Sequence, residues 1–172
     1  TSTLTSHKVA VQSLTQSAWG DEAYIGLQLI NHANSRFEIG RAQGFTLGVQ
    51  CLGAGLGFAY NLIELGSLAY NKVGVDCSNV TVAASAGWCN ENLFLNGNFH
   101  GNATTNPTLD RWGVRIRSQD PAPYYSNDNV FLKPCFELGD PSGTGGISYP
   151  VRIEHGVENS VLCARNEGNG NS

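Results

Sequence analysis

The sequence predicts an all-β protein, a right-handed parallel β-helix or solenoid with loop inserts, and three observations support this fold class. One short apolar pattern recurs five times along the chain. Each copy is followed by a second apolar run, usually introduced by Asn. The 21 glycines and the low fraction of charged residues, 14%, favour tight turns over long amphipathic helices.

The length of 172 residues suits one domain. We expect an N-terminal lead-in or cap over residues 1–25, parallel β-helix repeats over 26–166 and a flexible C-terminal tail over 167–172. Because the chain contains no Met, we also expect it to be a processed product or a fragment.

The first strand of each repeat begins with a small or rigid residue and continues as an apolar, polar, apolar triplet. The five starts are Gly26, Gly48, Gly74, Gly113 and Pro150. Alternation with period two places one set of side chains in the core. That set is Leu27 and Leu29, Val49 and Cys51, Val75 and Cys77, Val114 and Ile116, Val151 and Ile153. The polar residues between them are expected to face solvent: Gln28, Gln50, Asp76, Arg115 and Arg152.

The second strand of each repeat follows a lead residue at position 35, 61, 92, 129 or 159. Its apolar residues predict a further core column of Phe37, Ile63, Phe94, Phe131 and Val161, with Leu68, Phe99 and Phe136 seven places after the lead residue. The lead asparagines are expected to stack as a hydrogen-bonding ladder at the turns.

These strand pairs are too short to bury their own apolar faces, so stacking of successive repeats about 4.8 Å apart must complete the core. Polar inserts at 96–110, 119–128 and 139–148 fall where a solenoid tolerates loops, and such loops commonly have functional roles.

The charge balance excludes some partners. A net charge of −4 with only 10 Lys and Arg gives no basic stripe for nucleic acid. The longest uncharged stretch, between Arg41 and Glu64, is interrupted by polar residues and glycines, which argues against membrane insertion. The five cysteines and four histidines show no metal-ligand spacing, so we expect reduced, buried thiols, no metal and no cofactor.

Carboxylates at matched positions supply candidate acid pairs, and glycoside hydrolysis is one reaction that needs two carboxyl groups flanking the scissile bond. Glu38 and Glu64 occupy the same outward position in adjacent repeats and form the first catalytic pair; ordinary solvated surface charges are the alternative. Asp76 beside Arg115 and Arg152 is a second catalytic and anionic-sugar candidate, with a cross-strand ion pair as the alternative.

Aromatic residues near the inserts could stack on sugar rings. They are Trp88, Trp112, Tyr124 and Tyr125. Core packing or contacts between subunits would explain the same residues.

Three segments resemble the repeats of bacteriophage tailspikes and related pectin-lyase-like proteins: NLFLNGNF at 92–99, NDNVFLKPCFE at 127–137 and VRIEHGVENSVL at 151–162. The resemblance is one of pattern and covers residues 26–166. It implies a homotrimer in the phage tail, assembled in the host cytoplasm beside other virion proteins, of which this chain would be a fragment or a short spike. Such a protein binds bacterial capsule, exopolysaccharide or O-antigen and often depolymerises it as a hydrolase or a lyase.

Two alternatives remain open from the sequence. One is a non-catalytic trimeric receptor-binding or structural shaft of the virion. The other is a secreted β-helix enzyme acting on cell-wall polysaccharide, for which the glycosylation sequons at Asn79 and Asn102 are the available signal.

Overall fold

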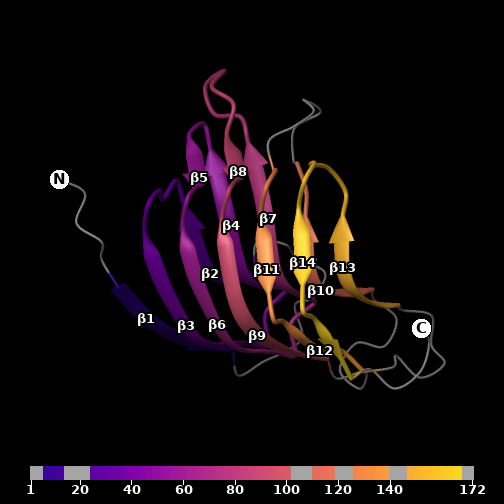
Figure 1. Ribbon diagram of the computed structural model, residues 1–172. Helices are drawn as coiled ribbons and strands as arrows, with labels where there is room; N and C mark the ends of the chain where they lie inside the picture. The colour runs from indigo at the N-terminus through magenta and orange to yellow at the C-terminus, as the bar shows by residue number, and fades with distance from the viewer. Residues whose placement is uncertain (1–5, 14–23, 102–109, 119–125, 140–146, 168–172) are drawn as a thin grey trace.

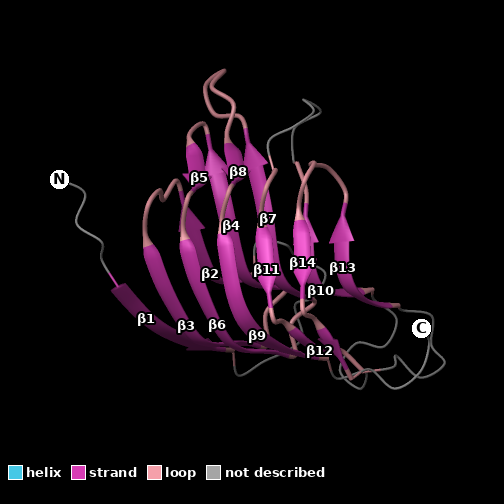
Figure 2. Ribbon diagram, viewed as in Figure 1, coloured by secondary structure: helices cyan, strands magenta, loops and turns pink. Residues whose placement is uncertain are grey.

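The computed structural model describes residues 6–13, 24–101, 110–118, 126–139 and 147–167. Among these residues it is all-β, with no helix, and accordingly with none that could span a membrane (Figure 2). The strands are β1 (Ser6–Gln12), β2 (Ile25–Ile30), β3 (Arg36–Gln43), β4 (Leu47–Ala54), β5 (Gly57–Ala59), β6 (Leu62–Ala69), β7 (Val73–Val80), β8 (Trp88–Asn90), β9 (Leu93–His100), β10 (Arg111–Ile116), β11 (Val130–Leu132), β12 (Cys135–Glu137), β13 (Ser148–Ile153), β14 (Ser160–Leu162) and β15 (Arg165–Asn166).

The strands form three parallel sheets. An eight-stranded sheet has the order β1-β3-β6-β9-β11-β14, with β12 and β15 at its side, and a five-stranded sheet has the order β13-β10-β7-β4-β2. The third sheet is the pair β5-β8. The chain alternates between the sheets, so that each repeat adds a strand to the five-stranded sheet and then to the eight-stranded sheet (Figure 1).

The predicted register is confirmed. Val75 lies beside Val49 on one side and Val114 on the other, as parallel Cα partners. The inward columns form one core between the sheets, with Val49, Val75 and Val114 fully buried. Leu27, Val151 and Val161 are partly buried and pack against this core, whereas Ile153, on the edge strand β13, is 48% exposed.

The asparagine ladder is also present. The side-chain amides of Asn61, Asn92 and Asn129 each donate to the side-chain oxygen of the next member, ending at Asn159, over 2.9, 2.9 and 3.0 Å. The same amides donate to backbone carbonyl oxygens one turn away, so the buried amide groups are satisfied. The residue before each lead position has a left-handed backbone, with φ between 52° and 60°: Asn34, Tyr60, Glu91, Asp128 and Glu158.

The glycines at the strand starts have a packing reason. A Cβ on Gly74 would lie 2.5 Å from Cδ1 of Phe99 and 2.6 Å from the carbonyl oxygen of Gly113. Gly26, Gly48 and Gly113 have equally close neighbours. Small residues therefore recur at these positions because side chains and neighbouring strands approach the backbone there.

The structure places part of the N-terminal segment and shortens one expected insert. Strand β1 lies in the expected lead-in region and pairs with β3, so it extends the eight-stranded sheet. The insert expected from residue 96 begins later, because β9 continues to His100 and pairs with both β6 and β12.

Candidate functional site

Glu38 and Glu64 lie side by side on the outer face of the eight-stranded sheet, as Cα partners of β3 and β6. Both side chains are partly exposed. Arg36, from the same face, forms an ion pair with Glu64. Adjacent parallel strands lie about 4.8 Å apart, which is close to the carboxyl separation of about 5 Å in retaining glycosidases. The strand register therefore confirms the prediction that Glu38 and Glu64 occupy matching positions in adjacent repeats.

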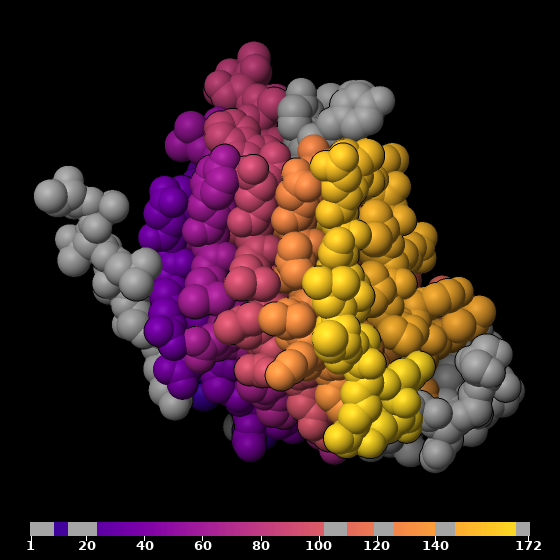
Figure 3. Space-filling view, in the orientation of Figure 1, coloured from indigo at the N-terminus to yellow at the C-terminus, as the bar shows by residue number. Residues whose placement is uncertain are grey.

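The same face becomes apolar toward the C-terminal repeats. In register with Arg36 and Glu64 lie six aliphatic side chains, here called the leucine patch: Leu62, Leu93, Leu95, Val130, Leu132 and Leu162. Leu93 and Leu162 are 38% and 49% exposed. Figure 3 shows this face, with successive repeats as adjacent bands from indigo to yellow. An exposed patch of this kind is typical of an interaction surface.

Asp76 lies in a buried ion cluster, so its expected position in solvent is wrong. Its carboxylate is fully buried and accepts from Arg115 Nε at 2.6 Å and from Arg117 Nη2 at 3.2 Å. Gln50 Nε2 donates to the same carboxylate at 3.1 Å. Gln28 Nε2 in turn donates to Gln50 Oε1 at 2.7 Å, so the polar side chains form a row across the strands.

The expected solvent face of the five-stranded sheet is therefore buried in its middle strands. Hydrogen bonding along the polar row explains how these groups tolerate burial, since each charge has a partner. Burial removes Asp76 and Arg115 from the residues that could touch a polysaccharide.

Trp112 is also withdrawn from solvent, at 7% exposure. Its ring stacks on Tyr149, and the guanidinium carbons of Arg115 and Arg152 lie 5.6 and 5.2 Å from its centroid. Trp112 therefore takes part in internal packing and cation–π contacts, and a sugar ring cannot reach its face. Arg152 remains at the surface, where it pairs with Glu154 at 2.8 Å.

Trp88 keeps part of its ring in solvent, at 38% exposure. It belongs to β8, and a Cβ on Gly57 would lie 2.2 Å from its Nε1, so its ring rests on the glycine backbone of β5. Trp88 therefore remains a sugar-stacking candidate, but in a different sheet from Glu38 and Glu64. Tyr124 and Tyr125 lie outside the described residues.

The cysteines are free, and the expectation of burial holds for three of them. Cys51, Cys77 and Cys89 are fully buried, and burial raises the pKa of all three thiols. Cys135 is partly buried and Cys163 is exposed, so the expectation is wrong for these two.

Asn79 is fully buried in β7 and accepts a hydrogen bond from Ser126. This burial argues against a glycan at Asn79 in the folded protein. Asn102 lies outside the described residues.

Sequence reasoning missed a cluster of metal-ligating groups formed by Cys135, Glu137 and Glu167, next to His100. A signal was present in the sequence, because His100, Glu137 and Glu167 each stand eight places after a lead Asn. The expectation of no metal rested on ligand motifs whose members lie close in sequence, whereas these groups come from separate repeats.

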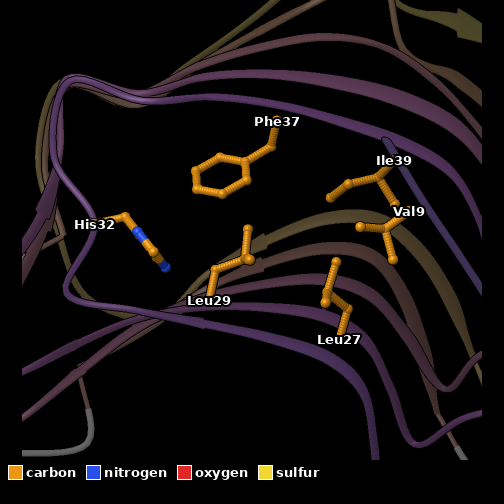
Figure 4. Close-up of a pocket in the computed structure, with 6 residues that line it drawn as sticks. All are labelled: Val9, Leu27, Leu29, His32, Phe37 and Ile39. Carbon is orange, nitrogen blue, oxygen red and sulfur yellow. The ribbon is translucent and has the colours of Figure 1, made fainter. Parts of the chain in front are cut away.

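A small apolar cavity opens where β1, β2 and β3 begin the core. Its volume is about 220 Å³, and its walls are Val9, Leu27, Leu29, His32, Phe37 and Ile39. Figure 4 shows the ring of Phe37 beside His32, and their centroids lie 5.1 Å apart. The lining offers one imidazole and no carboxylate, so this cavity does not supply the acid pair that glycan cleavage requires.

Comparison of the chain with protein-family models, curated proteins and solved structures finds no match.

Proposed function

We propose that this chain is a segment of a right-handed parallel β-helix of the phage tailspike type, which binds a bacterial surface polysaccharide and depolymerises it. The observation that supports cleavage is the pairing of Glu38 with Glu64 on an exposed face of a parallel sheet. Association with other virion proteins and assembly in the host cytoplasm belong to the same proposal.

The ion pair of Glu64 with Arg36 motivates the roles assigned within the pair. Arg36 orients Glu64 and balances its charge, which suits a carboxylate that attacks the sugar or activates water. Glu38 is then the proton donor to the leaving oxygen. The parallel ladder holds both carboxylates on regular strands, which gives the fixed geometry that such chemistry needs.

The test uses the protein with purified capsule, exopolysaccharide and O-antigen from a panel of bacteria. New reducing ends, with or without absorbance from unsaturated uronates, would report cleavage. We expect Glu38→Gln and Glu64→Gln each to lower turnover by about 10² to 10⁴-fold while binding is retained. Glu154→Gln is the matched control, because Glu154 is a surface carboxylate that follows β13 and is paired with Arg152. Equal activity in all three variants would contradict the assigned pair.

A second candidate, the non-catalytic trimeric shaft, is favoured by the leucine patch. Burial of this patch against other copies would remove apolar surface from water at about 25 cal/mol per Å². Binding of polysaccharide without new chain ends in the wild type would leave adhesion and assembly as the function.

Sedimentation analysis tests the assembly. We expect the wild type to sediment as a trimer and Leu93→Lys with Leu162→Lys to release monomers, because lysines would be buried without partners at the contact. Ile30→Lys, at an apolar position 42% exposed on the five-stranded sheet, should leave the trimer intact. A monodisperse wild-type monomer would count against the assembly.

A further inference from the structure

The C-terminal strands of the eight-stranded sheet bring a thiol, two carboxylates and an imidazole to one area of its surface. Cys135 and Glu137 lie on β12, Glu167 follows β15, and His100 ends β9. The candidate ligand atoms of Cys135, Glu137 and Glu167 all lie within 4.8 Å of one another. The parallel register produces this grouping, since β12 pairs with β9 on one side and β15 on the other.

The spacing suits a small metal ion. Cys135 Sγ lies 3.5 Å from Glu137 Oε1. A tetrahedral zinc site with Zn–S near 2.3 Å and Zn–O near 2.1 Å would place those two ligands about 3.6 Å apart. The existing distance therefore requires little movement of either side chain.

The charges around the cluster also favour a cation. The candidate ligand oxygens of Glu137 and Glu167 lie within 4.8 Å of each other, and a cation bound between two such carboxylates would offset their mutual repulsion. Arg165 Nη2 lies 2.5 Å from Glu167 Oε1 and supplies one positive charge. The Arg165 side chain is 66% exposed, so water screens this charge.

We propose that Cys135, Glu137 and Glu167 bind a divalent metal ion of the zinc type, with Glu137 held in place by His100. A thiolate ligand favours zinc over calcium or magnesium, which prefer oxygen donors. His100 Nδ1 lies 3.0 Å from Glu137 Oε2, in the position of an outer-shell partner that orients a ligating carboxylate. Three protein ligands leave a fourth position for water.

Such an ion would connect the last repeats of the sheet. Glu137 belongs to one repeat and Glu167 to the next, so both would be tied through one metal. Ligand binding to the folded chain raises its melting temperature. Zinc should therefore raise the melting temperature of the wild type more than that of a variant that lacks one ligand.

The experiment titrates Zn²⁺ into the full chain, reduced and freed of metal by chelation, and follows heat and melting temperature. Replacement by Co²⁺ adds a spectroscopic readout, because a thiolate ligand gives a near-ultraviolet charge-transfer band. We expect one ion per chain, at least tenfold weaker binding in Cys135→Ser, Glu137→Gln and Glu167→Gln, and loss of the band in Cys135→Ser. His100→Gln should weaken binding by about 10- to 100-fold.

Two control variants match the chemistry. Cys163→Ser removes an exposed thiol and Glu154→Gln a surface carboxylate, and both should bind as the wild type does. Absence of saturable binding, or binding and a charge-transfer band that survive Cys135→Ser, would overturn the site. If Cys135→Ser fails to fold by circular dichroism, unchanged affinity in Glu167→Gln, which alters an exposed side chain, would overturn it equally.

Discussion

At the scale of single residues, the asparagine ladder stabilises the turns because each amide satisfies groups in two repeats. Asn92→Ala would remove the partner of the Asn61 amide and of the backbone carbonyl of Phe58. Each buried group left unsatisfied costs about 1–3 kcal/mol. We expect a loss of about 2–4 kcal/mol, measured by urea unfolding. Asn159→Ala should cost less, because Asn159 is the last member of the ladder and only partly buried. Equal losses in the two variants would contradict this explanation.

Asp76 makes a second residue-scale prediction. Asp76→Ala would leave the buried Arg115 and the part-buried Arg117 without this carboxylate. Breaking a buried ion pair in this way costs about 3–5 kcal/mol, whereas a surface pair contributes about 0–1 kcal/mol. Glu154→Ala, which breaks the exposed pair with Arg152, is therefore the control in urea unfolding. A similar small loss in both variants would show that the Asp76 cluster adds little stability.

At the scale of strands, close packing at the strand starts predicts a difference between two glycines. Gly74→Ala would drive a Cβ to 2.5 Å from the ring of Phe99, and overpacking of this kind costs about 1–3 kcal/mol. Gly40→Ala meets nothing closer than the carbonyl oxygen of Val9 at 3.7 Å, so its stability should change little. Thermal unfolding of both variants measures the difference, and a reversed order would refute the packing explanation.

Strand register was predictable from sequence because alternation and the lead asparagines repeat at matched offsets. These offsets place Val75 between Val49 and Val114. They also align Glu38 with Glu64. Alternation separates the two faces of a strand, but it does not say whether the second face is covered.

The burial of Asp76 and Trp112 was therefore missed. The group formed by Cys135, Glu137 and Glu167 was missed because its members belong to different repeats and only the stacking brings them together.

At the scale of the whole molecule, one core runs through all the repeats and encloses three thiols, Cys51, Cys77 and Cys89. Burial raises their pKa in the folded state above the value of about 8.5 that free thiols have. Below that pH both states hold the thiol protons, and the contribution to stability is complete. Above it the unfolded chain releases protons that the folded chain retains, so the free energy of unfolding falls as pH rises.

Urea unfolding between pH 7 and 10 measures this effect. Each shifted thiol contributes a slope of up to about 1.4 kcal/mol per pH unit above its unfolded pKa. Cys77→Ala should therefore flatten the decline. Thiol reagents should modify the exposed Cys163 in the native protein and the three core thiols only on unfolding. Rapid native modification of all the cysteines would mean that the stacked repeats do not enclose a continuous core.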